Sequence, residues 1–285
     1  MTAALRRKML RNGSLVRLRR GVYCTEPLYS AMQAYPVGPL ILQVRAAQAR
    51  LRAPSWATGL TSARLHGLVE PLEAASLLSL VAEPGTAAAR RYDGLRLSTA
   101  RVPVEDRTTV HGAACLALPR TLVDIARTQS LSTTLLIADD AVRKGVQPSD
   151  LAAALRRAAG KPGIRGARVA LSHVDGRRET PIESESFAFF VEAGLPLPEP
   201  QVWLGTDRVD FYWRAARLVG EADGKVKYSA ELGVDDGDGD ALWREKGRSD
   251  RLEDRGESVV RWTYADLRRR RHLLEARLRR HLGLG

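Results

Sequence analysis

The sequence has little cysteine and no long apolar segment, and each absence excludes a class of protein. Cys24 and Cys115 are the two cysteines in 285 residues, and they lie far apart without the spacing of metal ligands. This pattern predicts free thiols in a reducing compartment and no zinc site. No run of about 18 apolar residues occurs, so we expect no membrane-spanning helix. The N-terminus lacks the apolar part of a secretory signal, which favours a cytoplasmic protein.

Acidic residues are too few to balance the basic ones, at 33 against 45, so the net charge is +12. A basic excess attracts polyanions, among which nucleic acid is the usual partner. Lysine is scarce beside arginine, however, and a GC-rich genome also produces an arginine-rich composition. Composition alone therefore leaves both explanations open.

The distribution of the basic residues favours DNA binding. The first 25 residues contain no acidic side chain but carry the basic residues Arg6, Arg7, Lys8, Arg11, Arg17, Arg19 and Arg20. A second group lies near the C-terminus and comprises Arg261, Arg268, Arg269, Arg270, Arg271, Arg277, Arg279 and Arg280. Basic groups concentrated at the two ends of a sequence are typical of contact surfaces.

The N-terminal segment predicts a short helix followed by a hairpin. Residues 2–12 form a basic helical stretch, and Gly13 is placed to end it. Two short apolar runs then flank the turn at Arg20 and Gly21, which is typical of a β-hairpin. A winged-helix domain ends in this way, with its helix in the major groove and its hairpin along the phosphates.

The string SLVRLRRGVYC, residues 14–24, resembles the wing of the N-terminal domain of AbiEi antitoxins, which belong to type IV toxin–antitoxin systems. The resemblance covers roughly residues 1–27 and implies DNA and a cognate toxin protein as partners. A complete domain has one or two further helices before its recognition helix. We therefore expect a winged-helix remnant over residues 1–30. Either this domain is truncated, or the start codon of the gene has been assigned too far downstream.

The middle of the chain is less informative. We expect a mixed α/β module over residues 31–160, with strands near 77–83 and 95–102, as the antitoxin resemblance also implies. Residues 159–166 are rich in glycine and proline and predict a hinge before the domain at 165–285. This segment lacks the spacing of a phosphate-binding P-loop.

The C-terminal part predicts a helix, three strands, a helix, a strand and a final basic helix. Thr180, Pro181 and Glu183 form the start signal of the first helix, and Gly194 is its stop. The expected elements are helix 182–193, strands 201–204, 209–213 and 217–222, helix 241–255, strand 258–262, and a helix to about 281. The fold class is therefore α/β, of the α+β type.

This order of elements resembles the PD-(D/E)xK nuclease fold, and in particular its Vsr-like restriction-type members. Asp210, in RVDFYW, matches the aspartate of the second strand. Glu221, in LVGEADG, matches the acid of the third strand, with Asp223 on the same face, and Glu183 matches the glutamate of the first helix. The resemblance implies Mg²⁺ or Mn²⁺ held by Asp210, Glu221 and Asp223 for cleavage of DNA.

Physical chemistry is consistent with these assignments. Mg²⁺ prefers hard oxygen ligands, and carboxylates from neighbouring strands can hold it beside a phosphate and activate water. Glu221 and Asp223 are two residues apart, so a strand would direct both to one side. Carboxylates on a buried strand are costly and are not explained by packing.

The sequence departs from the nuclease motif at one position. The motif has a lysine two residues after the third-strand acid, whereas this chain has Asp223. Lys225, Lys227 or Lys246 can take that role from nearby, and we prefer Lys246. The candidate catalytic residues are thus Glu183, Asp210, Glu221, Asp223, Lys225 and Lys246.

Each candidate also has a structural explanation. Glu183 can be the third residue of a capping box. Asp210 can face solvent on an edge strand, and Glu221 and Asp223 can form salt bridges with arginines. Asp223 and Gly224 can also form a simple turn.

Three functions follow from these patterns. The first is a Mg²⁺-dependent DNA endonuclease. The second is a non-enzymatic, antitoxin-like regulator that binds DNA through its wing and carries an inactive nuclease fold. The third, RNA binding, is disfavoured because the sequence has no aromatic stacking platform.

Overall fold

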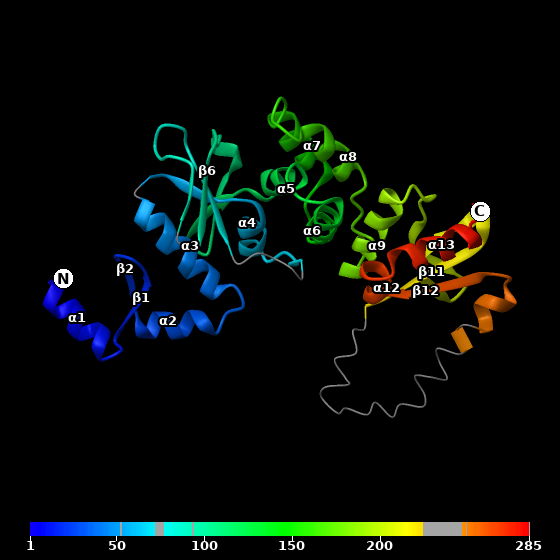
Figure 1. Ribbon diagram of the computed structural model, residues 1–285, viewed down its shortest axis with the longest axis horizontal. Helices are drawn as coiled ribbons and strands as arrows, with labels where there is room; N and C mark the ends of the chain where they lie inside the picture. Colours follow the sequence, from blue (N-terminus) through cyan, green and yellow to red (C-terminus); the bar gives the residue numbers. More distant parts are fainter. Residues whose placement is uncertain (52, 72–76, 93, 225–246, 249, 285) are drawn as a thin grey trace. The chain divides into compact units, whose positions relative to one another are not determined.

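The computed structural model describes residues 1–51, 53–71, 77–92, 94–224, 247–248 and 250–284. The chain divides into two compact units, each considered separately below (Figure 1). Unit 1 comprises Met1–Gln129 with Lys144–Ser172, and unit 2 comprises Ser130–Arg143 with His173–Gly285. The described residues form helices and three β-sheets, joined by turns and loops. This combination confirms the expected α+β class. Among these residues, no helix is both long and apolar enough to cross a membrane.

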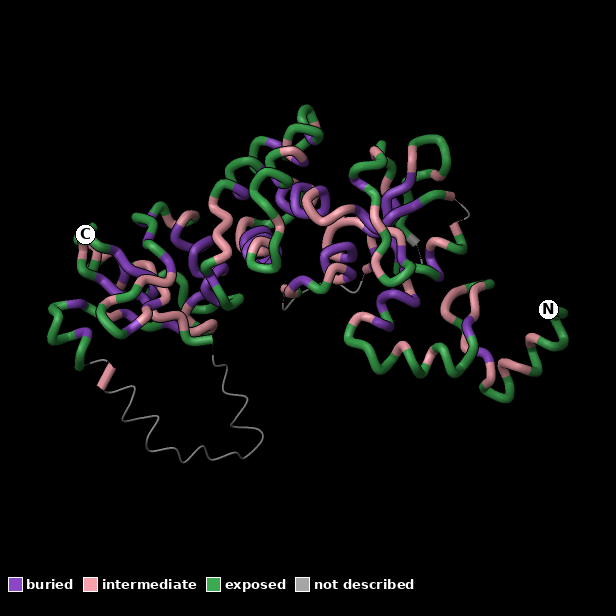
Figure 2. The backbone as a smooth tube through the Cα atoms, turned by 180° about the vertical axis from the view of Figure 1, so that it is seen from behind, coloured by how far each residue is buried: buried purple, intermediate pink, exposed green. Residues whose placement is uncertain are grey.

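The N-terminus of unit 1 is a helix followed by a two-stranded hairpin, as predicted. Helix α1 (Ala3–Arg11) begins at Thr2, whose hydroxyl accepts a hydrogen bond from the Leu5 N–H. Strands β1 (Leu15–Arg19) and β2 (Val22–Thr25) pair antiparallel, and Gly21 supplies the positive φ of the turn between them. No residue of α1 is buried (Figure 2). The helix therefore presents its basic side chains to solvent.

Two helices and a mixed six-stranded sheet follow in unit 1. The helices are α2 (Glu26–Gln33) and α3 (Gly38–Leu51). The strands, in sheet order, are β5 (Arg90–Tyr92), β6 (Leu95–Thr99), β4 (Leu78–Ala82), β3 (Ser55–Ala57), β8 (Ala113–Leu116) and β7 (Arg107–Val110). Apolar side chains of α3 and of the alternate sheet positions form one buried core, because one face of each element is apolar.

Unit 1 also contains a group of helices around α5 (Leu118–Ala126). Helix α4 (Gly59–Leu65) contacts α5, and so do α7 (Pro148–Arg157) and α8 (Ile164–Ser172). A short 3₁₀ turn, η1 (Val104–Asp106), precedes β7 and carries the buried Asp106. Proline near the start of α5 and α7 fits the first turn, where no intrahelical donor is needed.

Unit 2 is built on a four-stranded sheet of order β12-β11-β10-β9. Strands β9 (Glu199–Leu204), β10 (Asp207–Trp213) and β11 (Leu218–Asp223) are antiparallel, and β12 (Ser258–Thr263) is parallel to β11. Residues 250–254 are helical and lie before β12, as expected. The other helices are α6 (Leu131–Arg143), α9 (Pro181–Glu192), α12 (Tyr264–Arg268) and α13 (Arg271–His281).

An aromatic cluster fills the core of unit 2 on one face of the sheet. The Phe190 ring packs edge-on against Phe211, Trp213 and Trp262, with centroids 5.2–5.8 Å apart. Such pairs add about 0.5–1.5 kcal/mol each beyond the burial of their area. Gly220 makes this packing possible, since a Cβ there would lie 2.6 Å from Trp262 Cη2 and 2.9 Å from Trp213 Cζ3.

Helix α6 belongs to unit 2 through a buried ion pair. The sequence places residues 131–143 in the middle module, whereas their contacts group them with α9. The Asp139 carboxylate accepts from Arg178 Nε and from Ser184 Oγ, both at 2.7 Å. Arg178 and Asp139 are almost fully buried, and burial of a charge is tolerable only with such complete pairing.

Candidate functional site

The edge where strands β10 and β11 separate is the centre of the candidate site. The two strands are paired from Trp213 opposite Leu218 to Phe211 opposite Gly220. At the next position the Asp210 carboxylate accepts a hydrogen bond from the Ala222 N–H, at 2.8 Å. A side chain thus takes the place of a backbone carbonyl, and the carboxylate is held between the strands.

Gln201 on β9 has an unusual backbone at the same level of the sheet. Its φ is +56°, although its neighbours Pro200 and Val202 pair regularly with Phe211 and Val209 of β10. A left-handed conformation costs a non-glycine residue about 1–2 kcal/mol, and such strain is often found at functional sites. The sequence contains no signal for this feature, because glutamine has no preference for positive φ.

Glu183 joins the strained residue to the start of α9. Its carboxylate accepts from Gln201 Nε2 at 2.8 Å, from the Glu179 N–H at 2.9 Å and from Thr180 Oγ1 at 2.6 Å. Glu183 is buried, with 3% of its surface exposed. The expected capping box is not formed, because the Thr180 side chain makes no capping hydrogen bond and Glu183 accepts from the Glu179 N–H. Glu183 therefore links the start of α9 to β9 of the sheet.

Glu221 on β11 forms a two-point ion pair with Arg248. Arg248 Nη2 lies 2.8 Å from Oε1 and Nη1 lies 3.2 Å from Oε2. Arg248 also donates to the carbonyl oxygen of Arg208 on β10, at 2.7 Å. The salt-bridge explanation is thus confirmed for Glu221. Arg248 was not among the candidate residues, since nothing in the sequence relates it to a residue 27 positions earlier.

The three carboxylates Glu183, Asp210 and Glu221, here called the carboxylate row, influence one another electrostatically. Burial, with a smaller contribution from the charge of Glu183, raises the pKa of Asp210 to about 6, although the hydrogen bond from the Ala222 N–H lowers it. Burial and, to a lesser extent, the charge of Asp210 raise the pKa of Glu221 to about 7, although the charge and hydrogen bonds of Arg248 lower it. Both carboxyl groups therefore titrate close to neutral pH.

The carboxylate row offers the ligand chemistry of a divalent cation without a complete set of ligands. Carboxylate oxygens suit Mg²⁺ and Mn²⁺. Among the described residues, however, no three His, Cys, Asp or Glu side chains converge on a common metal position. Asp223 lies at the exposed end of β11, and Lys225, Lys227 and Lys246 lie outside the described residues. Asp210 and Glu221 could hold an ion once Glu221 releases Arg248.

The predicted DNA-binding residues of unit 1 occupy α1 and the hairpin. Arg7, Lys8 and Arg11 are exposed on α1, and the Arg6 guanidinium lies 5.6 Å from the centre of the Tyr23 ring.

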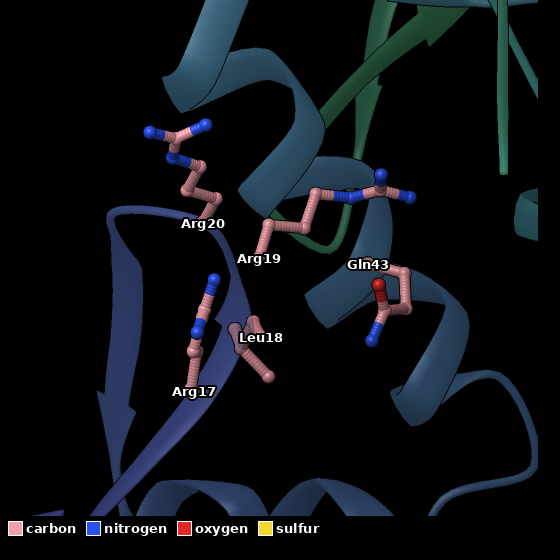
Figure 3. A pocket seen from close by; sticks show the side chains of 5 residues that line it. All are labelled: Arg17, Leu18, Arg19, Arg20 and Gln43. Atoms are coloured by element: carbon pink, nitrogen blue, oxygen red, sulfur yellow. The ribbon is translucent and has the colours of Figure 1, made fainter. Parts of the chain in front are cut away.

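The three arginines of β1 and its turn, here called the basic hairpin, are Arg17, Arg19 and Arg20. Together with Leu18 and Gln43 they line an open recess, in which Arg19 extends toward Gln43 of α3 (Figure 3). The recess is polar and basic, which suits an anionic partner.

Comparisons with known proteins give relatives without an assigned activity. The chain is 33% identical, over 183 residues, to uncharacterized proteins from two strains of Mycobacterium tuberculosis. The matched region covers 61% of this chain and 63% of each relative, so the chain spans less than two thirds of their length. No family model matches the chain.

Proposed function

We propose that unit 2 hydrolyses phosphodiester bonds of DNA with Mg²⁺ or Mn²⁺, and that unit 1 contributes to DNA binding. The observation that carries this proposal is the pair of half-buried carboxyl groups, Asp210 and Glu221, at the edge where two strands separate. Burial raises the pKa values of both groups, because it disfavours their charged forms. A positive charge placed between them would favour those charged forms. A divalent cation would supply that charge.

Each residue of the site has a distinct role in this proposal. A bound cation would stabilise charge on the phosphate and lower the pKa of a water nucleophile. Asp210, fixed by the Ala222 N–H, would hold the cation together with Glu221, once Glu221 is no longer bonded to Arg248. The released Arg248 guanidinium can then bind a phosphate oxygen, for which its forked geometry is suited. Glu183 and Gln201 position β9 beside these groups.

The basic hairpin would bind the DNA backbone. Guanidinium groups that contact phosphates provide affinity without sequence preference. Arg17 and Arg20 are exposed, and the Arg20 carbonyl is fixed by a hydrogen bond from Arg50 Nη1 of α3, at 3.2 Å. This bond ties the turn of the hairpin to α3, so that the turn is held in place before DNA arrives.

A nicking assay on supercoiled plasmid tests the proposal. We expect metal-dependent relaxation of the plasmid by the unmodified chain, and loss of at least about 100-fold in rate with Asp210→Asn, as for removal of a group that stabilises charge in a transition state. Glu275→Gln is the matched control, because Glu275 pairs with Arg279 on the surface of α13. Nicking that survives EDTA or Asp210→Asn would refute the assignment.

A second candidate function rests on the ion pair between Glu221 and Arg248. This pair already compensates one carboxylate without a metal, as expected for a nuclease fold that has lost activity. The chain would then be a DNA-binding regulator, with a toxin protein as a further partner. Salt-sensitive retardation of DNA without any metal-dependent nicking would favour this function over the first.

A further inference from the structure

A second group of charged residues lies in unit 1, around helix α5. Asp106, which is fully buried, accepts from Arg120 Nη1 at 2.7 Å and from Arg157 Nη2 at 2.8 Å. Asp124 accepts from Arg120 Nε at 2.8 Å and from Arg127 Nη1 at 2.7 Å. The residues therefore form one chain of ion pairs that connects η1, α5 and α7.

The charges in this network do not balance. Three arginines share two carboxylates. Lys161 directly precedes Pro162, whose carbonyl oxygen accepts a hydrogen bond from Arg127 Nε. Burial lowers the pKa of Lys161, and Arg120 and Arg127 lower it further, against the opposing effect of the two aspartates. The group thus carries two positive charges more than its carboxylates neutralise. In the part of the chain that the structure describes, no carboxylate within 4 Å pairs with the Lys161 ammonium group.

The loop that carries Lys161 is fixed against the end of α5. Arg127 Nε donates to the Pro162 carbonyl oxygen at 2.7 Å. Gly163 has φ +78°, and a Cβ there would lie 2.4 Å from the Arg127 carbonyl oxygen. A longer side chain at this position would push the loop away from the helix. Helix α8 begins at Ile164, directly after the loop, and a helix start carries a partial positive charge.

Helices α5, α7 and α8 lie side by side, so these cations come from elements that contact one another (Figure 1). Arg120 is buried and donates to both aspartates, so it contributes charge but no contact with a ligand. We propose that the three partly exposed cations, Arg127, Arg157 and Lys161, here called the α5 basic cluster, bind a phosphate-type oxyanion. A dianion matches the excess charge of the whole group. Guanidinium forks suit the geometry of phosphate oxygens, and an ammonium group adds a point charge. This site lies in unit 1 and does not depend on the activity proposed for unit 2.

Calorimetric titration of the full chain with inorganic phosphate, in a chloride buffer of low ionic strength, tests this site. Lys161→Gln removes one excess charge and leaves every ion pair of Asp106 and Asp124 intact, so the variant should fold. We expect Lys161→Gln to weaken phosphate binding by about tenfold, the usual value of a charge-assisted hydrogen bond. Arg96→Gln removes an exposed charge from β6 as a matched control and should change binding less than twofold.

The same titration distinguishes the source of the phosphate group. Displacement of bound phosphate by a short DNA duplex would assign the site to a nucleic-acid phosphate. Retention of phosphate in the presence of the duplex would assign it to a free phosphate or a small phosphate ester. Either result supports the site. Absence of phosphate binding, or equal effects of Lys161→Gln and Arg96→Gln, would overturn it.

Discussion

Asp210 holds its proton to a higher pH than an ordinary carboxylic acid, because burial disfavours the charged form. Its pKa is about 6 in the folded chain, and an unfolded aspartate titrates near pH 4. Between these values the folded state binds more protons than the unfolded state. The stabilising contribution is therefore complete below about pH 4 and is lost as the pH rises through 6.

A comparison with Asp210→Asn isolates this contribution, because asparagine does not titrate. Between pH 4 and pH 7 we expect the unmodified chain to lose on the order of 2 kcal/mol in free energy of unfolding relative to the variant. Urea denaturation can be followed by tryptophan fluorescence, to which the buried Trp213 and Trp262 of this unit contribute. A difference that stays constant with pH would show that Asp210 titrates normally in the folded chain.

Arg248 competes with any cation for Glu221, since both would occupy the same carboxylate oxygens. We therefore expect Arg248→Gln to bind Mn²⁺ on the order of fivefold more tightly, because a partly buried ion pair no longer has to break. Arg251→Gln is the matched control, as Arg251 pairs in the same two-point manner with Asp207. Equal Mn²⁺ affinities of these two variants in calorimetry would contradict the competition.

At the scale of an element, strand β9 contains Gln201, whose backbone has a positive φ and whose side chain donates to Glu183. Gln201→Gly and Gln201→Ala both remove the hydrogen bond to Glu183, but glycine tolerates a positive φ and alanine does not. We expect the alanine variant to be less stable than the glycine variant by about 1 kcal/mol. Equal free energies of unfolding of the two variants in urea would show that the backbone is not strained at this position.

The elements differ in how far the sequence predicts them, for physical reasons. Helix α9 is predictable because Pro181 and Gly194 are local start and stop signals. The hairpin of β1 and β2 is predictable for the same reason, through Gly21. The membership of α6 in unit 2 is not, because it depends on the pairing of Asp139 with Arg178, 39 residues away. No local pattern encodes such a partner.

The carboxylate row, too, is predictable only where local sequence patterns determine it. The expected strands that carry Asp210 and Glu221 are present and lie side by side in one sheet. The sequence gives no indication that Arg248 pairs with Glu221 or that Gln201 donates to Glu183. Both contacts join segments distant in sequence, and both depend on where the strands end.

At the scale of the whole molecule, the arginines behind the net charge of +12 differ in whether a carboxylate already pairs with them. Many C-terminal arginines are paired within unit 2, as Arg268 is with Glu185 and Arg271 with Glu192. Paired arginines attract DNA less than exposed ones, because their charge is already compensated. We therefore expect the exposed Arg17 and Arg20 of the basic hairpin, with the exposed basic residues of α1, to contribute more to DNA binding than their number suggests.

The salt dependence of DNA binding tests this distribution. We expect alanine at Arg17, Arg19 and Arg20 together to weaken binding and to lower the slope of log K against log salt by about two to three units, one for each lost phosphate contact. Alanine at Arg268, Arg271 and Arg279, which are paired, is the control and should change the slope by less. A slope unaffected by the hairpin substitutions would place the DNA on another surface.

The binding of a divalent cation tests the central claim most directly, because it requires no knowledge of the DNA substrate. Calorimetric titration of the full chain with Mn²⁺ at pH 8 keeps both carboxyl groups charged, since their pKa values are about 6 and 7. We predict saturable binding that is lost in both Asp210→Asn and Glu221→Gln and retained in Glu275→Gln. Absence of binding, or binding that both substitutions leave unchanged, would contradict a metal-dependent site at the carboxylate row.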